Sequence, residues 1–289
     1  MESELRLCFE NTHFWRDGKK VLRDISCQVR VGEHWAILGP NGSGKTTLMK
    51  IAVGYEPSSL GRVFLVEGWL SRISLPEVRT KVGFVSSALI DHLVRWSPDA
   101  TGLEIVLSGK YAVVGAVRNA PTPEKERARD LLRRFGMGRL EEIPFRILST
   151  GERQVCLVAR SYMSESELVI LDEPCAGLDL AAREIVLGAL DTACRERPHV
   201  PQVLITHHPE EIVPSITHVL LLKEGEVVAQ GPKEEVLNQS NLSATYGISL
   251  GVVRKDGRVW AIPSEVLPQT VRPFSKCPDM HTPRPEGRV

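Results

Sequence analysis

The sequence has no C-x-x-C pair and no cysteine spacing typical of zinc ligands, although six cysteines are spread over its 289 residues. This lack of paired cysteines argues against a disulfide or zinc framework and predicts separate, reduced thiols. Long apolar runs are missing too, because none approaches the roughly 18 residues of a membrane span. The first residues lack the charged-then-apolar layout of a signal peptide. A cytoplasmic location is therefore expected.

Net charge is likewise absent, since 36 basic residues balance 36 acidic ones. The overall charge gives no argument for a nucleic-acid partner or for an anionic membrane surface. There is no internal repeat. The length is sufficient for one large domain or for a domain with an inserted lobe.

A glycine-rich motif is the strongest feature that the sequence does contain. It consists of Gly39, Pro40, Asn41, Gly42, Ser43, Gly44, Lys45, Thr46 and Thr47, and it fits the pattern G-x-x-x-x-G-K-[ST]. The apolar run 35–38 precedes it and a helix-like segment follows it, which is the order strand, loop, helix. Glycines allow successive backbone N–H groups to point inward, Lys45 adds a positive charge, and the Thr46 hydroxyl can ligate magnesium. The motif predicts a nucleotide phosphate site.

Two polar positions follow apolar strands later in the chain. The predicted strand 168–171 ends in Asp172 and Glu173, and an acidic residue at such a strand end orients magnesium in P-loop sites. In the alternative interpretation, the two carboxylates favour the N-terminus of a helix that Pro174 opens. His207 follows the predicted strand 203–206, where it is either a γ-phosphate contact or a structural histidine.

An antiparallel hairpin is predicted for residues 5–9 and 21–29, with a polar turn between them. Phe14 and Trp15 lie just before this turn. One of the two aromatic side chains is expected to face outward and stack on an adenine ring, and the alternative is a place in the core.

The middle of the chain is predicted to be mainly helical. Apolar residues at helical spacing in 123–135 predict a helix within a lobe at about 88–165. Ser149 and Glu152 have the S-x-x-E spacing of a capping box, which alone explains their presence. We expect a domain at 1–250 that includes this lobe, a C-terminal hairpin at 251–262 and a flexible proline-rich tail at 263–289.

Five motifs follow one another along the chain, at residues 39–47, 148–152, 168–173, 176–179 and 206–207. This set resembles the nucleotide-binding domain of an ATP-binding cassette (ABC) ATPase over about residues 5–247, because the Leu-Ser-x-Gly-Glu segment before an acidic strand is specific to that family. The resemblance implies an α/β fold with a P-loop NTPase core of ABC type, an antiparallel β subdomain and an inserted helical subdomain. Several segments are also similar to a bacterial group labelled as molybdate-type transport ATP-binding proteins.

The resemblance implies roles for individual residues, with ATP and Mg²⁺ as cofactors. Trp15 stacks on adenine, Lys45 binds the β- and γ-phosphates, and Thr46 and Asp172 hold magnesium. Glu173 is the general base for the attacking water and His207 contacts the γ-phosphate.

The resemblance also implies that Ser149 and Gly151 serve the opposite subunit of a two-fold dimer and that Asp179 lies between the two sites. In the Leu-Ser-x-Gly-Glu segment, Thr150 and Glu152 stand where glycine and glutamine are usual in the family. Ser87 stands where the family has a glutamine that reaches magnesium and links to a membrane partner, so it needs a bridging water.

The function expected from this resemblance is that of an ATP-binding and ATP-hydrolysing subunit of an ABC transporter. It forms a homodimer on ATP and drives separate transmembrane subunits from the cytoplasmic face of the inner membrane. Ser87 supports an alternative, a soluble stand-alone ABC ATPase that acts on a ribosome or on DNA. Glu173 argues against a non-hydrolysing nucleotide sensor.

Overall fold

An antiparallel sheet of order β2-β1-β4-β5 contains the N-terminal strands of the computed structural model, which describes residues 4–264. Its strands are β1 (Leu5–Arg16), β2 (Lys19–Arg30), β4 (Leu60–Leu65) and β5 (Gly68–Trp69). The predicted hairpin is confirmed, but both strands are longer than expected because their outward polar residues belong to the alternating pattern. Asp17 and Gly18 have φ values of 50° and 76°, as a two-residue turn between twisted strands requires.

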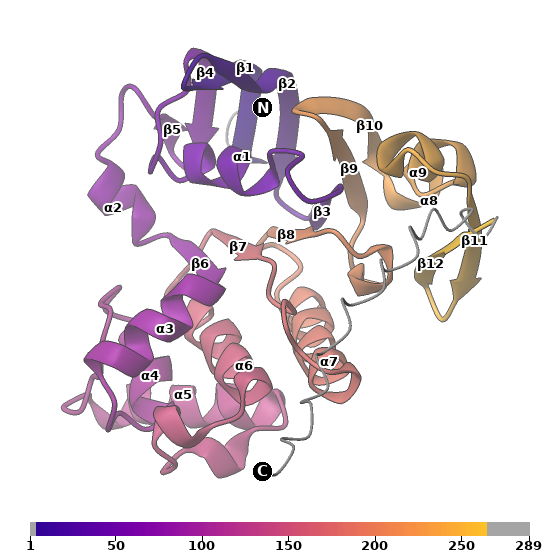
Figure 1. The fold of residues 1–289 in the computed structure, drawn as a ribbon. Coiled ribbons are helices and arrows are strands. Elements are labelled where there is room, and N and C mark those ends of the chain that lie inside the picture. The colour runs from indigo at the N-terminus through magenta and orange to yellow at the C-terminus, as the bar shows by residue number, and fades with distance from the viewer. Residues whose placement is uncertain (1–3, 265–289) are drawn as a thin grey trace, which may run out of the picture.

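A six-stranded sheet of order β10-β9-β3-β8-β7-β6 forms the centre of the molecule (Figure 1). Its strands are β3 (Trp35–Leu38), β6 (Val82–Ser86), β7 (Leu168–Asp172), β8 (Gln202–Thr206), β9 (His218–Lys223) and β10 (Glu226–Pro232). All neighbours are parallel except the edge pair β9 and β10. Strands β3 and β8 are buried throughout, as expected where both faces of a parallel sheet are covered.

Helices cover this sheet, and four of them form a lobe between β6 and β7 (Figure 1). The lobe contains α3 (Ser87–Trp96), α4 (Gly102–Ser108), α5 (Thr122–Arg134) and α6 (Thr150–Ser161). The other α-helices of residues 4–264 are α1 (Lys45–Ala52), α2 (Leu75–Arg79), α7 (Leu180–Glu196), α8 (Lys233–Val236) and α9 (Gln239–Tyr246). The helix predicted within 123–135 is therefore confirmed as α5, and the fold class is the expected α/β fold.

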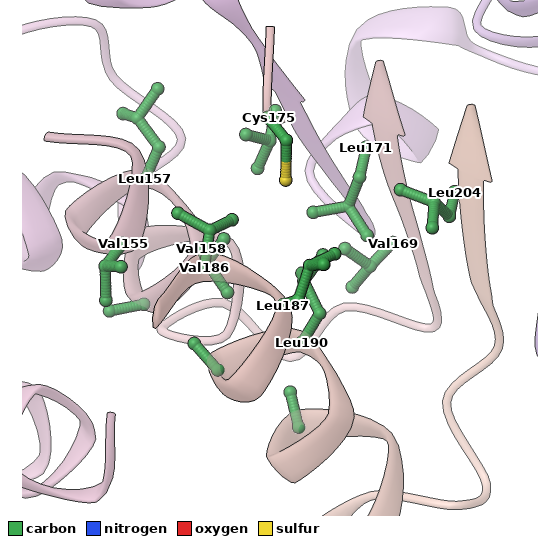
Figure 2. Packing of buried hydrophobic residues seen from close by; sticks show 14 of the residues in the cluster. Val155, Leu157, Val158, Val169, Leu171, Cys175, Val186, Leu187, Leu190 and Leu204 are labelled. Carbon is green, nitrogen blue, oxygen red and sulfur yellow. The ribbon is translucent and has the colours of Figure 1, made fainter. Parts of the chain in front are cut away.

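Two hydrophobic clusters share the central sheet. Val169 and Leu171 of β7 face α6 and α7, where Leu187 and Leu190 pack against them (Figure 2). The alternate residues of the same strand, such as Ile170, belong to the cluster that contains α1. Successive strand side chains point to opposite faces, and each fully buried branched side chain contributes roughly 1.5–3 kcal/mol.

A short hairpin ends the described part of the chain. It consists of β11 (Leu250–Lys255) and β12 (Arg258–Pro263), joined by Asp256 and Gly257 with φ values of 50° and 73°. This confirms the predicted C-terminal hairpin, whereas the tail predicted from residue 263 lies almost entirely outside the described residues. The five cysteines between residues 4 and 264 are free and buried. Across the same residues, no helix has the length and apolar character that crossing a membrane requires.

Candidate functional site

The glycine-rich loop connects β3 to α1 at the carboxyl end of the central sheet. Gly39 has no room for a side chain, because a Cβ atom there would lie 2.0 Å from the Leu222 carbonyl oxygen of β9. Gly44 has a φ of 105°, in the region that favours glycine. The carbonyl of Ser43 accepts from the Gly225 amide at 2.9 Å, and the Gly225 carbonyl accepts from the Arg23 amide at 2.8 Å. The β9–β10 turn and β2 therefore hold the loop in place.

Lys45 begins α1 with its amine folded back over the loop. Its Nζ donates to the carbonyls of Gly39 at 2.9 Å and Pro40 at 3.0 Å, and it lies 3.9 Å from Oε1 of Glu173. Burial lowers the pKa of Lys45, an effect that the nearby carboxylates of Glu173 and Asp172 oppose. The neighbouring Ser43 hydroxyl is buried without a hydrogen-bond partner among the described residues. An ammonium group and a buried polar oxygen beside a helix N-terminus fit a phosphate ligand.

Thr46 and Asp172 bring two oxygen atoms together beside Lys45. The Thr46 hydroxyl donates to Oδ1 of Asp172 at 3.4 Å. Asp172 is the last residue of β7, where it pairs in register with Ser86 on one side and Ile205 on the other. Burial and then the charge of Glu173 raise the pKa of Asp172. A hydroxyl and a carboxylate are hard oxygen donors, which fit Mg²⁺.

Glu173 leaves β7 in the left-handed region, with a φ of 48°. Its amide donates to the Ile205 carbonyl at 3.0 Å, and its Oε1 lies 3.4 Å from Nδ1 of His207. A non-glycine residue held in this region is strained, which is frequent at functional sites. The structure thus brings Lys45, Glu173 and His207 together at adjacent strand ends.

The alternative role of Pro174 as the first residue of a helix is wrong. Residues 174–177 form turns, and α7 begins only at Leu180, after Asp179. The left-handed conformations of Glu173 and of Gly177, at φ 73°, redirect the chain before the helix. The Asp179 carboxylate caps α7 by accepting from the Ala182 amide at 2.8 Å.

The two adjacent aromatic residues before the first turn face opposite ways. Phe14 is buried in the core, whereas Trp15 is half-exposed and stacks on the His13 ring at a centroid distance of 5.6 Å. The Lys20 amine lies 5.7 Å from the Trp15 ring centroid. Trp15 is therefore the aromatic side chain of the pair that a base can reach. Ser87 begins α3 directly after β6.

The Leu-Ser-x-Gly-Glu segment caps α6, as its spacing predicts. The Ser149 hydroxyl accepts from the Glu152 amide at 3.3 Å, and Oε2 of Glu152 accepts from the Ser149 amide at 2.8 Å. The Glu152 carboxylate also pairs with Arg139. Ser149, Gly151 and Asp179 line a cavity of about 390 Å³ that is separate from the Lys45 site. One copy of the chain therefore does not bring Ser149 and Gly151 to its own phosphate loop.

A larger cavity of about 870 Å³ extends from Thr46, Asp172 and Glu173 toward the helical lobe. Away from the carboxylates, its wall is apolar and aromatic, with contributions from Tyr55, Phe84, Leu89 and Val114. The carboxylates at one end suit a polar group, whereas the side chains of the wall suit an apolar one. The cavity can therefore make two different kinds of contact.

Sequence reasoning missed the residues that hold the loop after His207. Thr206 and Glu211 hydrogen-bond to each other within the loop, while Tyr246 and Arg258 reach it from α9 and β12. These partners lie 39 and 48 residues from the loop positions that they contact. No local motif marks them, because their role depends on how the C-terminal elements pack.

Comparison with known proteins identifies the family of this fold and motif set. The ABC transporter family profile matches residues 22–176. YlmA of Bacillus subtilis, an uncharacterised ABC transporter ATP-binding protein, is 36% identical over 90% of this chain and 98% of its own length. MntB of the same organism, the manganese transport system ATP-binding protein, is 31% identical over 79% of this chain and 87% of its own.

Among solved structures, cbiO1 of Clostridium perfringens, part of the ABC transporter complex cbiONQ, is similar with a TM-score of 0.70 and 28% identity. The match covers 83% of this chain and 94% of cbiO1. The narrower resemblance to the molybdate-type group stays a prediction. The chain belongs to the ABC transporter family, as one of its ATP-binding subunits.

Proposed function

We propose that this subunit binds ATP at residues 39–47 and hydrolyses it with Glu173 as the general base. The observation that supports this most strongly is the convergence of Glu173 on both Lys45, at 3.9 Å, and His207, at 3.4 Å. The Glu173 carboxylate accepts a proton from the attacking water while the water oxygen bonds to the γ-phosphorus and the bond to the bridging oxygen of ADP breaks. Lys45 and His207 stabilise the charge on the phosphate oxygens.

Thr46 and Asp172 are the residues that hold a magnesium ion in this proposal, and their oxygen atoms support it. When bound, the ion neutralises charge on the β- and γ-phosphates. Ser87 contributes through a bridging water at most, because its side chain is two atoms long. Trp15 provides the exposed aromatic face for the adenine ring.

We further propose that the active form is a two-fold homodimer. Ser149 and Gly151 lie at the N-terminus of α6, where backbone N–H groups and the helix dipole attract anions. Their separate cavity supports a role toward the phosphate group that the partner subunit holds. In a two-fold dimer, Ser149 and Gly151 of each subunit complete the phosphate site of the other. Release of the γ-phosphate then opens the dimer.

The apolar wall of the 870 Å³ cavity supports docking of a separate transmembrane subunit. Tyr55, which is part of this wall, is 58% exposed, and Trp96 on α3 of the helical lobe is 69% exposed. A helix of a partner that offers apolar side chains and a carboxylate fits such a surface, because Arg79 and Arg160 border it. The chain then works at the cytoplasmic face of the membrane.

An inorganic ion is the cargo class that we propose. MntB carries the name of a manganese transport system, and the sequence also resembles a group labelled for molybdate. Manganese and molybdate differ in charge but are both small inorganic ions. Elemental analysis of cells that lack the gene, compared with complemented cells, tests this: equal metal and oxyanion contents would contradict it.

The function is tested with a Glu173→Gln variant expressed as a tagged protein in the native host. The variant is expected to bind ATP, to lose nearly all turnover, and to co-purify with an integral membrane protein in mild detergent. Lys45→Ala is the control that abolishes nucleotide binding. Full turnover in Glu173→Gln would remove Glu173 as the base. Co-purification with ribosomes or DNA in place of a membrane protein would favour the soluble ATPase.

A further inference from the structure

The loop that follows β8 carries His207 on one side and is held from the other side by the C-terminal elements. The side chain of His207 faces Glu173, with 3.4 Å between Nδ1 and Oε1. This Nδ1 atom is buried and makes no hydrogen bond of acceptable geometry to any described residue. The imidazole otherwise contacts the ring of His208, its neighbour in the chain, at a centroid distance of 4.1 Å. Its position therefore depends largely on the backbone that carries both rings.

Tyr246 makes a hydrogen bond to that backbone. Its hydroxyl donates to the His207 carbonyl at 2.8 Å. Tyr246 is the last residue of α9, a helix capped by Asn238 at its N-terminus and by Gly247, with φ 72°, after its C-terminus. The Lys223 amine donates to the Ala244 carbonyl at 2.6 Å and ties α9 to β9. The phenol therefore projects from a fixed support.

Arg258 holds the other end of the same loop. Its Nε donates to the Glu210 carbonyl at 2.8 Å, and its two terminal nitrogens donate to the Glu184 carboxylate of α7 at 2.6 and 3.1 Å. The side chain is only 15% exposed. Two hydrogen bonds from one guanidinium to one carboxylate fix the orientation of the Arg258 side chain better than a single bond does. Through Arg258, β12 therefore connects the loop to α7.

Within the loop, two further hydrogen bonds limit its motion. The Thr206 hydroxyl bonds to the Glu211 carboxylate, and the His208 amide donates to the Thr206 hydroxyl at 3.0 Å. The His207 carbonyl has no part in these two bonds. The His207 carbonyl and the His208 amide form one planar peptide group, so Thr206 holds its N–H and Tyr246 holds its carbonyl oxygen.

We propose that Tyr246 is a positioning residue for ATP hydrolysis, which holds the His207 peptide so that the imidazole stays aimed at the γ-phosphate. The C-terminal segment 239–263 is then part of the catalytic apparatus through the backbone of this loop. This rests on the proposed role of His207 in hydrolysis. Tyr246 does not touch the substrate, so its loss reduces turnover without reducing ATP affinity.

The test compares Tyr246→Phe, which removes only the hydroxyl, with wild type in steady-state ATPase assays. We expect kcat to fall about tenfold, within the roughly hundredfold that a 1 Å misplacement can cost, with KM unchanged within about twofold. Tyr162→Phe is the matched control, because the Tyr162 hydroxyl is buried without a hydrogen-bond partner among the described residues. It is expected to keep the wild-type kcat.

A double-mutant cycle with His207→Ala separates positioning from general damage. In the His207→Ala background, Tyr246→Phe is expected to have no further effect, because there is no imidazole left to aim. An equal loss in both backgrounds, or a normal kcat in Tyr246→Phe while His207→Ala is impaired, would overturn the proposal for Tyr246 alone. Full activity of His207→Ala would instead reject the role of His207, and the role of Tyr246 with it.

Discussion

Gly39→Ala is the most demanding test of the phosphate loop, because the loop and β9 are in direct contact at this residue. An added Cβ would lie 2.0 Å from the Leu222 carbonyl oxygen and 2.9 Å from the Ser43 hydroxyl. A carbon and an oxygen atom need about 3.3 Å, so the loop or the strand must move by more than about 1 Å. The atom in the way belongs to backbone within the central sheet, which cannot rotate aside as a side chain does.

The backbone N–H groups of the loop move with Gly39, so ATP affinity is expected to fall about a hundredfold, or roughly 2.7 kcal/mol. Isothermal titration calorimetry with Mg²⁺ and ATP measures this loss, and a thermal melt of the same sample shows whether the variant is folded. Gly188→Ala is the control. Gly188 lies within α7 with no atom near its added Cβ, so the change is expected to stabilise the fold by about 0.5–1 kcal/mol at unchanged affinity. A folded Gly39→Ala protein with wild-type affinity would refute this reasoning.

Three further predictions concern single residues. Trp15→Ala is expected to weaken ATP binding by about 1–3 kcal/mol, and ATP is expected to change Trp15 fluorescence; unchanged affinity in a titration would exclude stacking. Burial lowers the pKa of His34, whose Nδ1 accepts from the Gln202 amide at 3.2 Å. Because its pKa is lower in the folded chain, His34 binds a proton more tightly in the unfolded chain. The free energy of unfolding therefore falls as the pH drops below about 6.5. Urea titrations of wild type and His34→Asn between pH 5 and 7 check that the variant lacks this part of the slope. Ser149→Ala is expected to cost about 0.5–2 kcal/mol by removing the cap of α6, which the same titrations at pH 7 would detect or contradict.

Much of the fold was predictable because its signals are local. The order strand, loop, helix around Lys45, the apolar run that ends in Asp172 and the turn at Asp256 and Gly257 each depend on a few adjacent residues. The helix cap formed by Ser149 and Glu152 is local in the same sense. Such patterns form the same local structure in different folds, because the residues that interact are adjacent in the sequence.

The remaining features depend on contacts between distant segments. Pro174 follows an acidic pair and resembles the first residue of a helix, but the strand-end conformation of Glu173 delays α7 to Leu180. The hydrogen bond from Tyr246 to His207 joins two segments that no sequence period relates. The outward direction of Trp15 followed from the alternation of β1 only once its register was known.

The anchoring of the phosphate loop also affects how the protein is made. Strand β3 lies between β8 and β9, and the loop after it is bonded to the β9–β10 turn through Gly225. During synthesis, β3 and the loop leave the ribosome before the strands that flank β3, which are made about 170 to 180 residues later. A nascent chain that stops short of Gly225 therefore has the complete glycine-rich motif but lacks the turn that holds it, and ATP can support folding of this site only after that turn has been made.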